Sequence, residues 1–198
     1  MSASSGRRSA APGRRSAAPD GRPAPPGGKP APPAKAGTWT LRPPRPEDFA
    51  WVVERHRVFY RGEHGWDDRF MGLVEKVVED FVRDFDPARE KCWIADLDGR
   101  PVGSVFLVAH PEREGVAKLR LLLVEPDARG LGIGARLVAE CTAFARAVRY
   151  RAITLWTSSV LLGARRIYEA EGYRLVREAP EPMFNEGEMG QEWELELE

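Results

Sequence analysis

The sequence predicts an α/β domain in which helices flank a sheet, and three features of the chain support this prediction. From residue 39 onward, segments with the apolar spacing of helices alternate with short apolar runs that are typical of strands. The expected order of elements is β-α-α-β-β-β-α-β-α-β-β. Since 42% of the 198 residues are hydrophobic, the chain can bury one full core, and we expect a single domain over residues 39–198.

Residues 1–38 differ from the rest of the chain in composition and charge. They contain seven Arg or Lys residues and one Asp, so they carry +6, which leaves −6 for residues 39–198. Pro, Ala, Gly and Ser dominate, and the segment GRRSAAP occurs twice. Because such a segment has few large apolar side chains to offset the entropy of ordering, we expect a disordered tail or linker. A weak contact with nucleic acid and an organellar targeting signal are the alternatives, although the prolines oppose the amphipathic helix of a targeting signal.

One strand and two helices are expected before residue 86. The run TWTLRP at 38–43 is a strand pattern, and Pro46 followed by two acidic residues is typical of a helix start. The second helix has the clearer pattern, because its apolar residues from Phe70 to Phe85 keep a spacing of three and four, with charged residues opposite. Both patterns predict helices that pack against a sheet.

The remaining elements are mainly strands. Asp98-Gly99 between two apolar runs predicts a hairpin, and the uninterrupted run LRLLLV at 119–124 predicts a central strand. The last strand alternates strictly, which places Trp193, Leu195 and Leu197 on one face. The other expected elements are helices at about 133–149 and 161–172 and strands at 91–97, 101–110, 152–156 and 173–178.

The segment EPDARGLGIGARLV at 125–138 places three glycines at alternate positions between the central strand and a helix. Glycines let a backbone approach a ligand closely, and the N–H groups and dipole at a helix start attract an anion such as a pyrophosphate. A triphosphate-binding loop would need Gly-Lys-Ser/Thr, but Ala135 and Arg136 follow Gly134. A dinucleotide-binding fingerprint would need its third glycine one residue later and an acidic residue at the end of the next strand. Both alternatives fit poorly.

Two motifs instead give the chain a resemblance to a known superfamily. The first is Arg-x-x-Gly-x-Gly at 129–134, which resembles the coenzyme A loop of the GNAT superfamily of N-acetyltransferases. The second is ARRIYEAEGY at 164–173, which resembles the Ala-x-x-x-Tyr-x-x-x-Gly-Phe/Tyr segment of the same superfamily. The resemblance extends over residues 39–198 and is closest to acetyltransferase domains fused to MarR-type regulators, although residues 1–38 show no winged-helix pattern. It implies the GNAT fold, a mixed and mostly antiparallel sheet of six or seven strands flanked by about four helices.

The resemblance also implies a binding site for acetyl-coenzyme A, whose acetyl group would pass directly to a primary amine in a ternary complex, without a covalent acyl-enzyme or a metal. The strand backbone would pair with the pantetheine arm, and the arginine and the amides that follow it would hold the pyrophosphate. The implied cofactor-binding residues are Leu122, Leu123, Val124, Arg129, Gly130, Leu131, Gly132, Ile133, Gly134 and Ala135.

The resemblance makes Tyr168 the general acid, since a phenol with an ordinary pKa of about 10 can protonate the departing thiolate. A core tyrosine is the alternative. A strand amide near Val124 would stabilise the oxyanion.

The basic glutamate that some members carry on the fourth strand is replaced by Lys118, so we consider Glu125 as the base, with an electrostatic role or simple exposure as the alternative. The asparagine often found seven residues before the tyrosine is replaced by Leu161, which puts one coenzyme contact in doubt.

The acceptor amine is expected near the turn between the first two helices, because these helices wall the acceptor site in this superfamily. The segment YRGEHGWD gathers polar and aromatic side chains there, and chance clustering at a helix junction is the alternative. The implied substrate-binding residues are Tyr60, Glu63, His64, Trp66 and Asp67. We expect His56, on an apolar stripe, and His110, at a strand end, to be structural.

Composition restricts the remaining choices. Cys92 and Cys141 are far apart and form no metal motif, so we expect buried free thiols in a cytoplasmic protein without a metal site. No apolar run approaches the roughly 18 residues that cross a bilayer.

We expect a small-molecule amine or the amine of a peptide or protein as acceptor, and the −6 charge favours a cationic acceptor over nucleic acid. A non-catalytic acyl-coenzyme A sensor, an aminoacyl-tRNA-acetylating toxin and a homodimer stay open.

Overall fold

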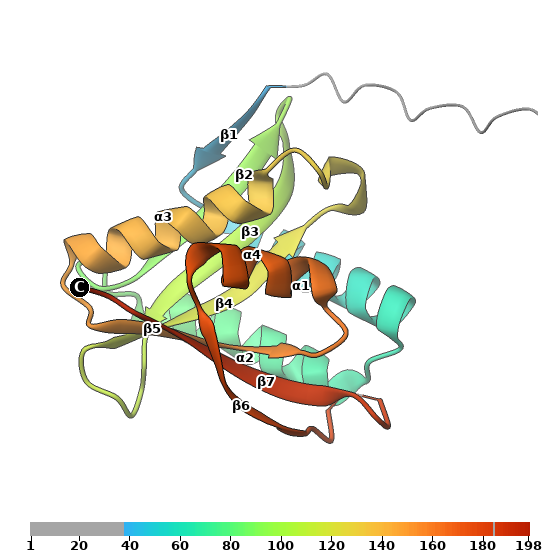
Figure 1. The fold of residues 1–198 in the computed structure, drawn as a ribbon. Helices are drawn as coiled ribbons and strands as arrows, with labels where there is room; N and C mark the ends of the chain where they lie inside the picture. The colour runs from blue at the N-terminus through green and yellow to red at the C-terminus, as the bar shows by residue number, and fades with distance from the viewer. Residues whose placement is uncertain (1–37, 184) are drawn as a thin grey trace, which may run out of the picture. The chain divides into compact units, whose positions relative to one another are not determined.

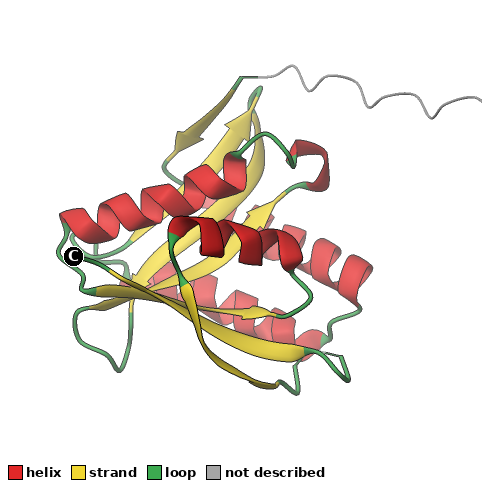
Figure 2. Ribbon diagram, in the orientation of Figure 1, coloured by secondary structure: helices red, strands yellow, loops and turns green. Residues whose placement is uncertain are grey.

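The computed structural model describes residues 38–183 and 185–198, which form a sheet flanked by helices (Figures 1 and 2). Seven strands make one mixed sheet in the order β1-β2-β3-β4-β5-β7-β6, and the order of helices and strands along the chain is the predicted one. The predicted tail at 1–38 lies outside the described residues, apart from Thr38. The strands are β1 (Trp39–Arg42), β2 (Lys91–Leu97), β3 (Arg100–Ala109), β4 (Val116–Val124), β5 (Ala152–Ser158), β6 (Arg174–Pro180) and β7 (Met189–Glu196).

Two helices cover each face of this sheet. α1 (Pro46–Phe59) and α2 (Asp68–Asp84) lie on one face, and α3 (Ile133–Ala147) and α4 (Leu162–Glu171) lie on the other (Figure 1). A π-helical turn at Tyr60–His64 follows α1 directly, so part of the segment expected to be a turn is helical. The fold class expected from the sequence is confirmed.

The core consists of apolar side chains packed between the sheet and each pair of helices. Each large side chain that is removed from water contributes about 1.5 to 3 kcal/mol to the free energy of folding. On the side of α3 and α4 the buried residues include Val105, Leu107, Leu137, Val138 and Ile153, and on the side of α1 and α2 they include Val52, Val78, Phe81, Ile94 and Phe106. Cys92 and Cys141 are buried and free, as predicted, and burial raises the pKa of both thiols. Trp193 and Leu195 are also buried, as the alternation of the last strand predicts.

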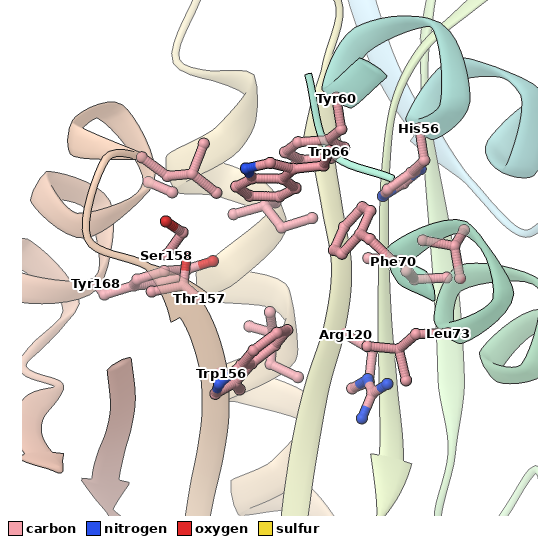
Figure 3. A pocket seen from close by; sticks show the side chains of 16 residues that line it. His56, Tyr60, Trp66, Phe70, Leu73, Arg120, Trp156, Thr157, Ser158 and Tyr168 are labelled. Atoms are coloured by element: carbon pink, nitrogen blue, oxygen red, sulfur yellow. The ribbon is translucent and has the colours of Figure 1, made fainter. Parts of the chain in front are cut away.

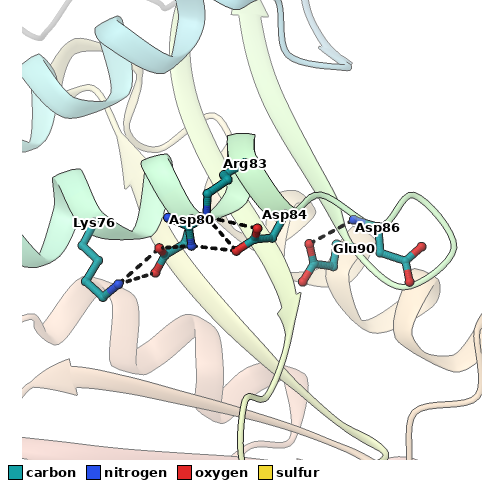
Figure 4. Close-up of polar contacts among 6 residues, drawn as sticks. All are labelled: Lys76, Asp80, Arg83, Asp84, Asp86 and Glu90. Atoms are coloured by element: carbon teal, nitrogen blue, oxygen red, sulfur yellow. Dashed lines mark hydrogen bonds and ion pairs between the residues drawn. The ribbon is translucent and has the colours of Figure 1, made fainter.

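The outer face of α2 carries a network of exposed ion pairs (Figure 4). Lys76 Nζ lies 2.9 Å from Asp80 Oδ2, and Arg83 Nη2 lies 2.8 Å from Asp80 Oδ1. Hydrogen bonds from Lys76 and Arg83 lower the pKa of Asp80. Both carboxylate oxygens of Asp80 are therefore occupied by cations of its own helix.

The feature that shapes the site is the separation of β4 from β5. These two strands run parallel and are paired from Val116↔Ala152 to Leu119↔Leu155, after which they part. Just beyond this point β4 contains a bulge, because Leu121 has φ 50° and the register with β3 shifts there. A left-handed residue other than glycine costs roughly 1 kcal/mol or more. The hydroxyl of Ser104 donates to the carbonyl oxygen of Leu121 at 3.0 Å and supports the bulge.

Candidate active site

Two hollows meet where β4 and β5 part. The first, here called the α3 groove, has a volume of about 560 Å³ and lies between β4, the start of α3 and α4. The second, here called the aromatic pocket, has a volume of about 80 Å³ and lies between β4, β5, α1, α2 and α4 (Figure 3). Tyr60, Leu122, Leu161 and Ala164 line both hollows, so a molecule in one can reach a molecule in the other.

The α3 groove contains an open helix N-terminus. Gly130 and Gly132 have φ of 81° and 78°, which only glycine adopts without strain, and they turn the chain into α3. No side chain caps this helix, so its first N–H groups and the positive end of its dipole face the groove. Of the ten predicted cofactor-binding residues, nine line the groove. The exception is Leu131, whose carbonyl oxygen accepts a hydrogen bond from Trp39 Nε1 at 3.2 Å and whose side chain packs against the core.

Arg129 holds a positive charge at the mouth of the groove. Its guanidinium carbon lies 4.6 Å from the centre of the Phe59 ring, and its Nη1 lies 3.9 Å from Glu63 Oε2. Its Nε donates to the carbonyl oxygen of Val124 at 3.4 Å. The side chain is exposed, so it can still turn toward an anion at the start of α3.

Aromatic side chains from the turn between α1 and α2 and from the start of α2 form one wall of the aromatic pocket. The rings of Tyr60 and Trp66 are stacked, with centres 4.7 Å apart and planes 4° apart, and Phe70 packs edge-on against Trp66. Among the predicted substrate-binding residues, Tyr60 and Trp66 line this pocket, whereas Glu63 and His64 line the α3 groove. Asp67 lines neither hollow. It is the N-cap of α2, and its side chain accepts a hydrogen bond from the Arg69 amide at 2.9 Å.

A loop near the end of the chain fastens this turn. Glu188 Oε2 accepts hydrogen bonds from Trp66 Nε1 at 3.0 Å and from Ser158 Oγ at 3.3 Å. Asn185 Nδ2 donates to Glu188 Oε1 at 2.9 Å and to the carbonyl oxygen of His64 at 2.5 Å. Residues more than 120 positions apart in the chain thus meet at the edge of the pocket.

Tyr168 lies on α4 and lines the aromatic pocket. It is 4% exposed, and burial raises the pKa of its phenol well above the ordinary value, so the hydroxyl stays protonated. The hydroxyl makes no hydrogen bond within the described ranges. It is therefore available to a bound molecule.

Glu125 occupies a different place. Its two oxygens accept hydrogen bonds from Arg55 at 2.5 and 2.8 Å, it is 6% exposed, and it lines neither hollow. The structure thus favours a role in holding α1 against the end of β4 over proton transfer.

The two histidines considered in the sequence make local hydrogen bonds. His56 Nδ1 lies 2.8 Å from the carbonyl oxygen of Val52, so this nitrogen carries the proton and donates. Burial lowers the pKa of His56 to about 4, which keeps the ring neutral, and the ring also lines the aromatic pocket. His110 Nδ1 accepts hydrogen bonds from two amides of the following turn, each at 3.1 Å.

Sequence reasoning missed Arg120, Trp156 and Ser158, all of which line the aromatic pocket. The signal for Arg120 was present, because a charged residue inside a buried apolar strand is rare and usually has a partner or a function. The other two lie at the end of β5, and their position at the opening depends on where that strand leaves β4.

Searches within the described residues found neither a group of three metal-ligating side chains nor a helix long and apolar enough to cross a membrane.

The chain was compared with known proteins. The sequence profile of the acetyltransferase (GNAT) family matches residues 52–173, which is more than half of the chain. N-acetylaspartate synthetase of Rattus norvegicus is 39% identical over 82 residues, which are 41% of this chain and 27% of that protein. The probable N-acetyltransferase camello of Xenopus tropicalis is 29% identical over 119 residues, which are 60% of this chain and 53% of that protein. The chain thus spans about a quarter to a half of the length of these relatives.

A solved structure supports the fold. The Salmonella typhimurium protein yncA, with its cofactor acetyl-CoA, superposes with a TM-score of 0.65 at 16% identity, covering 81% of this chain and 95% of that one. At this identity the likeness concerns the fold alone.

Proposed function

Because the chain belongs to the acetyltransferase (GNAT) family, we propose that it transfers the acetyl group of acetyl-coenzyme A to a primary amine in a ternary complex. One observation carries the proposal. The uncapped start of α3, preceded by two left-handed glycines, opens into a groove that adjoins a pocket containing the protonated Tyr168.

The residues of the α3 groove suit the coenzyme. Open N–H groups at a helix start bind a pyrophosphate, and Arg129 adds a cation beside them. Since β4 leaves β5 after Leu119, the backbone of 122–124 has a side that no strand covers, where the pantetheine arm would pair. Bound there, the coenzyme supplies a thioester that an amine can attack.

The aromatic pocket suits the amine. Tyr168 would protonate the departing thiolate, and the backbone amides around the bulge at Leu121 would stabilise the oxyanion. Burial lowers the pKa of His56 to about 4, which makes its ring a poor proton acceptor, so the proton lost by the amine would instead return to the Tyr168 oxygen. We assign Glu125 a positioning role through its pair with Arg55.

Calorimetric titration of acetyl-coenzyme A tests the proposal. The wild type is expected to bind in the micromolar range, and Gly132→Asp to bind at least about tenfold more weakly, because it places a negative charge beside the proposed pyrophosphate. Gly132→Asn is the matched control. Asparagine has almost the same shape and tolerates the left-handed conformation, so it should bind more tightly than Gly132→Asp. Absence of binding by the folded wild type would refute the proposal.

Tyr168→Phe separates an enzyme from a sensor. Loss of the hydroxyl should lower kcat by about 10² to 10⁴ while the Kd for acetyl-coenzyme A stays unchanged, because the ring and its packing remain. Steady-state kinetics and calorimetry on the same preparation measure both. Unchanged turnover of Tyr168→Phe would show that Tyr168 is not the general acid. A wild type that binds the coenzyme but acetylates no amine would favour the sensor.

Several finer predictions remain. They are a kinship with acetyltransferase domains fused to MarR-type regulators, a cytoplasmic location, a homodimer and a role for the basic tail.

A further inference from the structure

Arg120 places a guanidinium in the aromatic pocket. It directly follows Leu119, the last residue of β4 that pairs with β5, and Trp156 directly follows Leu155 on the facing strand. Figure 3 shows the side chain of Arg120 at the end of the pocket away from Trp66, with Trp156 across from it. Burial lowers the pKa of Arg120, yet a guanidinium stays protonated in proteins. The pocket therefore contains a permanent positive charge.

The protein supplies no counter-ion for this charge within the described ranges. No described carboxylate lies within the 4.0 Å of an ion pair with Arg120, and the acidic residue that acts on it from a distance is Asp80 of α2. Asp80 is already held by Lys76 and Arg83 (Figure 4). A charge that is largely removed from water without a partner is costly, so an anion from outside would be bound favourably here.

A second cation reinforces the field. Lys118 lies two residues before Arg120 and therefore on the same face of β4. Burial and the nearby Arg120 lower the pKa of Lys118, which shows that the two charges act on each other. Residues 39–198 carry −6, but the charged group that lines this end of the pocket is the cation Arg120, and the acidic residues that act on Lys118, Glu112 and Glu192, do not line it. The local charge therefore favours an anionic group where the net charge alone favoured a cationic acceptor.

From this arrangement we infer that the acceptor is a small amine that also carries a carboxylate, such as an amino acid. The inference rests on the proposed function. The carboxylate pairs with Arg120 through two parallel N–H donors, and the amine faces Tyr168. The apolar part of the acceptor packs against Tyr60, Trp66 and Phe70, and the pocket volume of about 80 Å³ favours a small molecule. The amine nitrogen bonds to the acetyl carbon as the carbon–sulfur bond breaks. The departing thiolate takes a proton from Tyr168, and the proton that the amine loses then returns to the Tyr168 oxygen.

Acetylation assays on the full chain test the inference. The acceptors are glycine, L-methionine and L-phenylalanine, each paired with its α-amide, together with L-aspartate, L-glutamate and the polycation spermidine. A free acid is expected to be the best acceptor, with kcat/KM at least about tenfold above that of its amide. Arg120→Met should raise the KM for the acid by about 100-fold and leave the amide unchanged, because the amide makes no ion pair. Arg120→Lys should restore part of the affinity, since it keeps the charge but not the paired donors.

Controls separate the inference from the proposed function. Arg113→Met removes a partly exposed arginine that pairs with Glu194, outside both hollows, and should leave the preference for acids unchanged. Coenzyme binding by calorimetry on each variant shows whether the donor site is intact. A wild type that binds acetyl-coenzyme A but prefers amides or spermidine, or acetylates none of the acids, overturns the inference alone. A wild type that binds no coenzyme refutes the proposed function. If Arg120→Met does not fold, the comparison of acids and amides on the wild type decides.

Discussion

Three titratable side chains of the aromatic pocket are largely removed from water. Burial disfavours the charged form of His56, Tyr168 and Arg120 alike. His56 is neutral and Tyr168 is protonated as a result, whereas Arg120 keeps its charge because the ordinary pKa of a guanidinium lies far above neutral pH. Burial therefore keeps the ring of His56 neutral and the phenol of Tyr168 protonated, while Arg120 stays a cation in spite of it.

Buried His56 predicts a loss of stability in mild acid. Its pKa is about 4 in the folded protein and about 6.5 in the unfolded chain, so the unfolded chain takes up the proton first. The contribution of the neutral His56 ring to the free energy of unfolding is complete above about pH 6.5 and is lost as the pH falls from about 6.5 to 4. The loss amounts to roughly 2 to 3 kcal/mol. Urea unfolding at pH 7 and pH 4.5 measures the difference. His56→Gln cannot titrate and should lose less stability; an equal loss would assign the effect to other groups.

The residues of the α3 groove were accessible to sequence reasoning because they are neighbours in the chain. A strand, a glycine-rich turn and a helix start form one continuous segment, and its backbone alone shapes the groove. The aromatic pocket is different. Glu188 meets Trp66 across 122 residues, and such a contact depends on the order of strands in the sheet, which no local pattern contains.

At the scale of elements, a half-buried ion pair fixes α1 to the end of β4. Arg55 is about one-third exposed at its side chain and Glu125 is nearly buried, and they share two hydrogen bonds. This pair holds the first wall of the aromatic pocket against the strand that forms its floor.

Removal of one partner tests the positioning role of Glu125. Glu125→Gln should lower the free energy of unfolding by about 2 kcal/mol, less than for a fully buried pair because Arg55 remains partly in water, while kcat changes little. Chemical denaturation and kinetics measure the two effects, and a double-mutant cycle with Arg55→Met should show non-additivity. A fall in kcat of about 100-fold with unchanged coenzyme affinity would instead support the role of general base.

The boundaries of the elements were less predictable than their order. Periodicity indicated α1 and α2 correctly, because their apolar stripes face the sheet. It did not indicate the π-helical turn at Tyr60–His64, which ends at the left-handed Gly65 and contains Tyr60 stacked on Trp66.

For the described molecule as a whole, the net charge and the charge inside the aromatic pocket differ in sign. Many acidic residues lie on exposed surfaces such as the outer face of α2, where Asp80 and Asp84 pair with neighbouring cations. Two cations, Lys118 and Arg120, remain on the buried strand instead. A sum over the sequence cannot reveal this separation of charge between surface and pocket.

The parting of β4 and β5 also bears on how such a protein can diverge. One side of the opening is formed by main-chain atoms, which nearly any substitution leaves in place, and the other by side chains from four separate elements. Mutations in these side chains can change which molecule binds on their side of the opening without disturbing the side formed by the main chain. If the proposed function holds, the backbone opening lets a lineage change its acceptor while it retains the same donor.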